Sequence, residues 1–261
     1  MKWETVKLDV RETGVAVLTF NRPETMNAVN DQFCRDVQAA CREVSENEAV
    51  RVLVVTGAGN GWSSGGDIST LAVIKDPISA KETYDSSGDL VTTIYELKKP
   101  VIAAVNGVVA GASLAACLAC DLIIASEKAR FGFTFMQLAF CPDSGASYFL
   151  NQKVGYHKAL ELLWFGKIID AAEADKLGFL NKIVSPEECL PEAIAWAERL
   201  ARQPMLTVGL DKKLMREACR NDYYQQTELE AMYQVLTWAS ADFQEGCRAF
   251  AEKRKPVFQN K

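Results

Sequence analysis

The sequence predicts an α/β fold, and two features carry this prediction. Up to about residue 200, short apolar strands alternate with glycine-rich turns and helices, which is the pattern of repeated strand–turn–helix units. From residue 186 onward the spacing of apolar residues is mainly helical. We therefore expect an α/β core over residues 1–200 and a helical region over residues 201–261, in a chain long enough to bury a sizeable core.

The chain begins with a predicted hairpin and a helix. Apolar and polar residues alternate over 6–10 and 15–19 on either side of a glycine, as in two half-buried strands. Apolar residues then recur at helical spacing over 31–46. Asn30 or Asp31 supplies the N-terminal cap of that helix.

Three further core strands are expected, at residues 50–56, 101–105 and 122–125, because each segment is almost continuously apolar. A helix of small residues is expected over 111–119. The C-terminal helices are expected at residues 187–202, 205–219, 223–238 and 243–252.

The composition excludes several classes of protein. The net charge is −5, and the only dense basic stretch, residues 253–255, is too short to be a nucleic-acid footprint. No apolar run reaches the roughly 18 residues of a membrane span, so no membrane partner is expected. No apolar signal segment follows Met1, so we expect a cytoplasmic protein whose eight cysteines are reduced thiols.

Neither a metal nor a cofactor is expected. The single histidine, His157, excludes sites that need two histidine ligands. The glycines of residues 57–61 follow a buried strand, but their spacing differs from a dinucleotide-binding fingerprint. The Cys117-x-x-Cys120 pair lies in an apolar helical run, where buried small side chains are a better interpretation than a redox or zinc site.

Two loops have the composition of an anion-binding site. Residues 63–68 and 106–113 each follow a strand and open a helix, and their small side chains leave backbone N–H groups approachable by a ligand. Asp67 can cap the first of these helices. Two exposed N–H donors from neighbouring loops can together hold an oxyanion.

Several motifs follow one another along nearly the whole chain. They are Phe20-Asn21-Arg22-Pro23 with Asn27-Ala28, Ser64-Gly65-Gly66-Asp67-Ile68, Ala110-Gly111-Ala112 after Asn106-Gly107, and Phe250-Ala251-Glu252-Lys253. In this order they resemble the motifs of the crotonase (enoyl-CoA hydratase/isomerase) superfamily. The resemblance implies a crotonase-like spiral of repeated ββα units with a C-terminal helical trimerisation region, and hence a homotrimer or a dimer of trimers.

The resemblance also implies an acyl-CoA thioester as the substrate, with no separate cofactor. The backbone N–H groups of Gly66 and Ala112 hold the thioester oxygen in this interpretation, and one such donor is worth about 3 kcal/mol of barrier. The residues expected to contact the substrate are Met26, Ala28, Ser64, Gly66, Asp67, Ile68, Gly111, Ala112, Phe135, Leu138, Phe250 and Lys253.

The sequence departs from the hydratases that it resembles. Those enzymes carry one glutamate after the second oxyanion loop and another after the next strand, where this chain has Ala115 and Phe135, which cannot move a proton. Asp143 stands where isomerases of the family, among them the ring-epoxide acyl-CoA isomerases of phenylacetate degradation, place a carboxylate. Phe133, Phe135 and Met136 are expected to line an apolar acyl pocket and to raise the pKa of Asp143.

We therefore expect an acyl-CoA isomerase that shifts a double bond, or rearranges a ring epoxide, through an enolate, with Asp143 as the proton shuttle. Other interpretations remain open. In one of them, Asp143 only caps a helix that begins at Gly145. In another, the acid is Asp85 or Asp89, in the segment 72–97. The chain could also be an enoyl-CoA hydratase, or a catalytically silent protein that binds acyl-CoA.

Overall fold

The computed structural model describes residues 2–74 and 76–259. Its strands are β1 (Val6–Val10), β2 (Val15–Phe20), β3 (Val52–Gly57), β4 (Gly61–Ser63), β5 (Val101–Val105), β6 (Val108–Ala110), β7 (Leu122–Ser126), β8 (Arg130–Gly132), β9 (Ile168–Asp170) and β10 (Lys182–Val184). They form a six-stranded sheet in the order β1-β2-β3-β5-β7-β10 and a four-stranded sheet in the order β4-β6-β8-β9.

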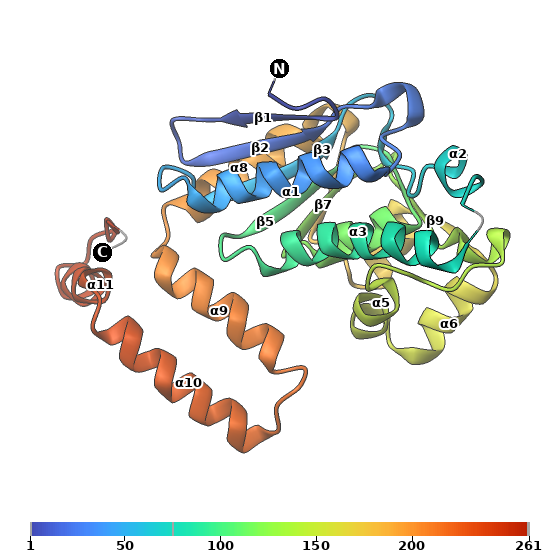
Figure 1. Ribbon diagram of the computed structural model, residues 1–261. Helices are drawn as coiled ribbons and strands as arrows, with labels where there is room; N and C mark the ends of the chain where they lie inside the picture. Colours follow the sequence, from blue (N-terminus) through green and yellow to red (C-terminus); the bar gives the residue numbers. More distant parts are fainter. Residues whose placement is uncertain (1, 75, 260–261) are drawn as a thin grey trace.

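Helices surround these sheets (Figure 1). They are α1 (Asp31–Glu46), α2 (Ile68–Leu71), α3 (Pro77–Glu96), α4 (Ala112–Ala119), α5 (Ala146–Val154), α6 (Tyr156–Trp164), α7 (Ala171–Lys176), α8 (Cys189–Ala201), α9 (Met205–Glu217), α10 (Tyr223–Trp238) and α11 (Ala241–Ala251). Three short 3-10 helices are η1 (Pro23–Thr25), η2 (Thr134–Leu138) and η3 (Pro186–Glu188).

Successive units of two strands and a helix build the fold. β1 and β2 form the expected antiparallel hairpin, and β2, β3, β5 and β7 run parallel. β3, β5 and β7 are each followed along the chain by a strand of the smaller sheet, namely β4, β6 and β8. This arrangement confirms the α/β class and the repeated ββα units that the sequence predicts.

Successive side chains of a strand point to opposite faces of the larger sheet. In the strands β2, β3 and β5 the side chains on both faces are buried, whereas the edge strand β1 is largely exposed. In β2, Ala16 and Leu18 face a core shared with α1, α3 and α4, whereas Val15 and Val17 face α8. The α1 helix has the expected bounds, and its cap is Asn30, whose side chain accepts a hydrogen bond from the N–H of Phe33 at 2.9 Å. Each face of the sheet therefore packs against its own helices.

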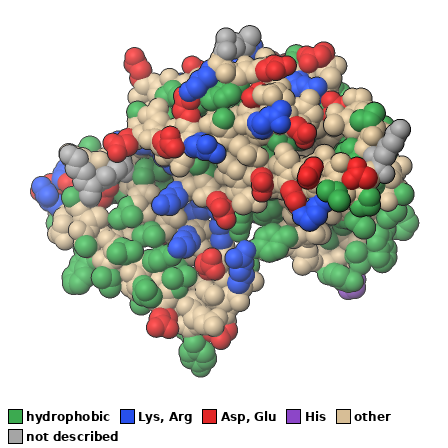
Figure 2. Space-filling view, in the orientation of Figure 1, with side chains coloured by type: hydrophobic (Ala, Val, Ile, Leu, Met, Phe, Trp, Pro, Cys, Tyr) green, Lys and Arg blue, Asp and Glu red, His purple; other side chains and the backbone are tan. Residues whose placement is uncertain are grey.

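The C-terminal helices α9 and α10 extend away from the sheets (Figure 1), and none of their described residues is buried. A charge cluster fastens α9 to the core. Lys212 Nζ lies 2.6 Å and an Arg216 guanidinium nitrogen 3.0 Å from the Asp121 carboxylate, which directly precedes β7. Figure 2 shows hydrophobic side chains gathered on the surface of this C-terminal part.

No helix within the described ranges is long and apolar enough to cross a membrane.

Candidate active site

The loops that follow β4 and β6 touch each other through glycine. Gly65 has a φ of +90°, and a β-carbon added there would lie 2.5 Å from the carbonyl oxygen of Ala110 and 3.3 Å from the Cα of Gly111. The Ser113 hydroxyl donates a hydrogen bond across the same junction to the carbonyl oxygen of Ser63, at 2.7 Å. Because Gly65 has no side chain, the two backbones come into contact.

This contact brings two backbone donors to one place. Val29 and Asp67 use their N–H groups in the bridge beside Gly66, each in a hydrogen bond of 2.8 Å. The N–H of Gly66 takes no part in that bridge. Ala112 is the first residue of α4, where N–H groups have no acceptor within the helix and the helix dipole favours an anion.

The backbone of Ala112 is compatible with its side chain. Its φ is not positive, in contrast to the +55° of the preceding Gly111, so the β-carbon is accommodated without strain. An alanine here therefore leaves the N–H donor in place.

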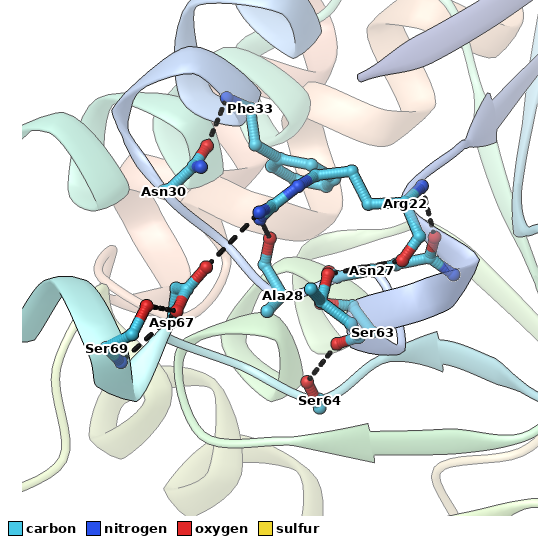
Figure 3. Close-up of polar contacts among 10 residues, drawn as sticks. Arg22, Asn27, Ala28, Asn30, Phe33, Ser63, Ser64, Asp67 and Ser69 are labelled. Atoms are coloured by element: carbon cyan, nitrogen blue, oxygen red, sulfur yellow. Dashed lines mark hydrogen bonds and ion pairs between the residues drawn. The ribbon is translucent and has the colours of Figure 1, made fainter.

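An ion pair supports the first loop (Figure 3). The guanidinium of Arg22 lies between the carbonyl oxygen of Ala28, at 2.5 Å, and the Asp67 carboxylate, at 3.2 Å. Asp67 also caps α2 by accepting from the N–H and the hydroxyl of Ser69. The Ser69 hydroxyl, and after it Arg22, holds the pKa of Asp67 below its usual range, so this carboxylate is engaged in structure.

Asp143 lies at the start of a tight turn before α5. Ser144 and Gly145 have φ values of 52° and 89°, and the N–H of Ala146 donates to the carbonyl oxygen of Asp143 at 2.8 Å, which makes a type I′ turn. The cap of α5 is Gly145, and no side chain caps that helix. The interpretation of Asp143 as a helix cap is therefore wrong.

Gly66, Ala112 and Asp143 line one cavity. One carboxylate oxygen of Asp143, Oδ1, is buried and has no hydrogen-bond partner in the described structure. Burial raises the pKa of the Asp143 carboxyl above its usual range, and a hydrogen bond from the Ser144 side chain opposes part of this shift. Burial, followed by the charge of Asp143, also raises the pKa of the Tyr84 hydroxyl on the facing α3.

Some of the residues predicted to contact the substrate line this cavity, and others lie away from it. Gly66, Asp67, Ala112 and Asp143 line it. Ser64 and Gly111 belong to the loops that carry the donors, and Ala28 lies between η1 and α1. Met26, Ile68 and Leu138 are exposed by 47%, 59% and 46% and do not line it.

The C-terminal candidates are separate from the cavity. Phe250, exposed by 88%, lines a different pocket formed by α9, α10 and α11, and Lys253 follows α11 on the surface. Figure 1 places α11 at the opposite end of the molecule from α2 and α5. Within one chain, Phe250 and Lys253 are therefore not brought to Asp143.

The prediction that Phe133, Phe135 and Met136 line the pocket is wrong. Phe133 and Phe135 are buried in the core and Met136 is half exposed, and none of them lines the cavity. A second, small cavity shares Val29, Ser87 and Ala112 with the first and is mostly apolar. Its other lining residues are Phe20, Phe33, Trp62, Ser63, Leu90, Val91, Ser113 and Ala116.

The structure also shows where Asp85 and Asp89, the alternatives to Asp143 as the acid, lie on α3. Asp85 pairs with Lys81 at 2.6 Å on the surface, and Asp89 is exposed, so neither lines the cavity. Tyr84 and Ser87, which the sequence interpretation missed, do line it. Their spacing with Val91 is that of one helix face, and this periodicity is the signal that could have identified them.

Two backbone N–H groups and a carboxyl group in one cavity are the arrangement typical of enzymes that stabilise an oxyanion. The comparisons with known proteins agree with this class. The chain belongs to the enoyl-CoA hydratase/isomerase family, whose model matches residues 10–261, and this places it in the crotonase superfamily.

Relatives in this family bear different names. The chain is 36% identical to the 1,2-epoxyphenylacetyl-CoA isomerase of Escherichia coli (strain K12), over 96% of this chain and 97% of that protein. It is 35% identical to the crotonyl-CoA hydratase of Syntrophomonas wolfei subsp. wolfei, over 100% of both chains. A solved enoyl-CoA hydratase subunit from Geobacillus kaustophilus HTA426 superimposes with a TM-score of 0.95 at 36% identity, over 100% of both chains.

Proposed function

We propose that this enzyme is an acyl-CoA isomerase in which Asp143 moves a proton between two carbons of an unsaturated or ring-epoxide acyl thioester. The ionised carboxylate removes a proton from the acyl group, and the electron pair left behind delocalises onto the thioester oxygen. Gly66 and Ala112 stabilise that oxygen through their N–H groups. Asp143 then returns the proton two carbons away, so that no water and no electrons are consumed.

One observation carries this proposal: among the described carboxylates that line the cavity, Asp143 is the one with a buried oxygen that has no hydrogen-bond partner. The cavity also receives Asp31 and Asp67. Asp67 is bound to Arg22 and Ser69, and Asp31 lies exposed in the first turn of α1. Asp143 combines a buried, unpartnered oxygen with a raised pKa, which is what a group that must both take and return a proton needs.

The two positions of the hydratase glutamates support the same proposal. Ala115 is fully buried inside α4, and Phe135 is 6% exposed, so neither offers a group that activates water.

The test compares two substrates and two variants. A 3-enoyl-CoA is expected to gain the absorbance of a conjugated thioester, whereas crotonyl-CoA is expected to keep it. Asp143→Asn and Asp143→Ala are expected to lose turnover by about 10²–10⁴-fold while acyl-CoA affinity changes little. Asp85→Asn is a control on the same side of the molecule, and its turnover should equal that of the parent protein.

The family names give a second candidate, the enoyl-CoA hydratase, since several relatives carry that name. Rapid loss of the conjugated absorbance of crotonyl-CoA would favour it and refute the isomerase. If no unsaturated acyl-CoA is converted and Asp143→Asn binds acyl-CoA like the parent, the chain is instead a binding protein.

We also propose that the enzyme is a homotrimer or a dimer of trimers. The support is α10, a helix of 16 residues with no buried residue, on which Met232, Val235, Leu236 and Trp238 are each more than half exposed. Exposed apolar surface of this kind is typical of an interface. Light scattering at micromolar concentration should give three or six times the chain mass of 28.8 kDa, and the mass of a monomer or a dimer would refute the proposal.

A further inference from the structure

Ser144 holds a backbone conformation that is unusual for its side chain. Its φ of 52° is left-handed, a region that costs an L-residue other than glycine energy and that type I′ turns usually fill with Asn, Asp or Gly. The turn is closed by the hydrogen bond from Ala146 to Asp143. A serine at this position therefore suggests that its hydroxyl contributes something that glycine lacks.

That hydroxyl meets a second one from a distant part of the chain. Ser144 Oγ lies 2.8 Å from Ser87 Oγ, 57 residues away on α3, and either oxygen can be the donor. Ser87 is 9% exposed and also lies 3.0 Å from the carbonyl oxygen of Tyr84, to which it can donate. The Ser144 side chain also lowers the pKa of the neighbouring Asp143 carboxyl, as a hydroxyl that can donate to it would.

Counting hydrogens leaves two arrangements. Each hydroxyl has one hydrogen to donate. In the first arrangement Ser144 donates to Ser87, and Ser87 donates to the carbonyl oxygen of Tyr84, so the carboxyl receives nothing from Ser144. In the second, Ser87 donates to Ser144, and Ser144 donates to Asp143. An ionised carboxylate favours the second arrangement, because hydrogen bonds to a charged acceptor are stronger than neutral ones.

We propose that Ser87 and Ser144 form a hydrogen-bond relay that reverses direction with the charge of Asp143, so that the carboxylate gains a donor when it ionises and releases it when it takes the proton. Both serines are positioning residues, since neither has to touch the substrate. The relay deepens the isomerase proposal, because a group that takes and returns one proton passes through both charge states in each turnover.

Other titratable groups also line the cavity that holds Asp143. They are Asp31 and Cys34 of α1, Asp67 of the first oxyanion loop, and Tyr84 of α3. Burial raises the pKa of the Cys34 thiol to about 11 and also raises that of the Tyr84 hydroxyl, so both stay neutral near pH 7. Arg22 pairs with Asp67, which leaves the serine relay as the adjustable partner of Asp143.

The experiment uses variants that keep the turn. Ser144→Gly removes the hydroxyl but suits the left-handed φ, and Ser87→Ala removes the second hydroxyl. Ala139→Gly is the matched control, because Ala139 also has a left-handed φ, of 54°, and does not line the cavity. The acid limb of kcat/KM is measured against pH, and the carboxyl of Asp143 is titrated directly by ¹³C NMR, with its signal assigned by its loss in Asp143→Asn.

We expect Ser144→Gly to raise the titration midpoint of Asp143 by about one pKa unit, because the ionised form loses its donor. Ser87→Ala should give a smaller rise, and the double variant should match Ser144→Gly, since Ser87 acts only through Ser144. An unmoved midpoint in Ser144→Gly overturns the relay, as does a double variant that adds the full effect of Ser87→Ala. If Asp143→Asn keeps its turnover, the isomerase proposal is refuted. The NMR midpoint of Asp143 still tests the relay in that case.

Discussion

Replacing Gly65 by alanine tests whether contact between the two loops creates the oxyanion site. The new β-carbon would lie 2.5 Å from the carbonyl oxygen of Ala110, a separation that real β-carbons do not adopt, so one backbone must move. The φ of +90° at Gly65 adds the strain of a left-handed alanine, about 1–2 kcal/mol. Since Gly66 and Ala112 directly follow the two touching segments, the movement separates their N–H groups.

The expected loss follows from the number of donors affected. If the thioester oxygen keeps one donor and loses the other, kcat should fall by about 10²–10³-fold. Gly178→Ala is a matched control, because Gly178 has a φ of +84° and nothing lies within 4 Å of its added β-carbon. That variant carries similar backbone strain without the clash. It should unfold about 2–6 °C lower than the parent and keep its kcat.

The assay measures kcat, KM and thermal unfolding for both variants, on the unsaturated acyl-CoA that the parent converts. A folded Gly65→Ala protein with a strongly reduced kcat is the expected result. If its kcat stays within about threefold of that of Gly178→Ala, a range well below the effect of one oxyanion donor, the contact between the loops does not set the oxyanion geometry and the reasoning fails.

Three further predictions concern stability, each measured as the free energy of unfolding in urea. Asp121→Ala should cost about 3–5 kcal/mol, because it leaves the Lys212 ammonium, whose side chain is 8% exposed, without its carboxylate; a loss below about 1 kcal/mol would contradict this. Burial raises the pKa of Asp143, so its stabilising contribution is complete below the unfolded value of about 3.9 and is lost as pH rises through the folded value. Asp143→Asn should therefore be more stable than the parent at pH 8, and an equal or lower stability would contradict the burial of this charge. Burial acts to raise the pKa of Asp36, but hydrogen bonds from Thr5 lower it overall. The stability advantage of the parent over Asp36→Asn should therefore be complete above about pH 3.9 and disappear as the pH falls through the lowered pKa. An advantage independent of pH would refute that assignment.

Local patterns in the sequence were sufficient for most of the elements. The spacing of apolar residues places a helix at Asp31–Glu46, and a small-residue run after two glycine turns places α4 close to its observed start at Ala112. Such features depend on residues within a few positions of one another, because helix periodicity and capping are interactions between near neighbours. The two oxyanion loops and Asp143 could be selected from the sequence for a similar reason, since their motifs are short and contiguous.

Only the tertiary structure decided which side chains face Asp143. Ser87 reaches Ser144 across 57 residues, and the side chain of Phe135 turns into the core instead of lining the cavity. Phe250 lies with α9, α10 and α11, away from the cavity of its own chain. No local pattern encodes these placements, because they depend on how α3, η2 and the C-terminal helices pack against the rest of the protein. The sequence by itself therefore determined the elements and the candidate reactive groups, and packing between distant segments determined the surroundings of those groups.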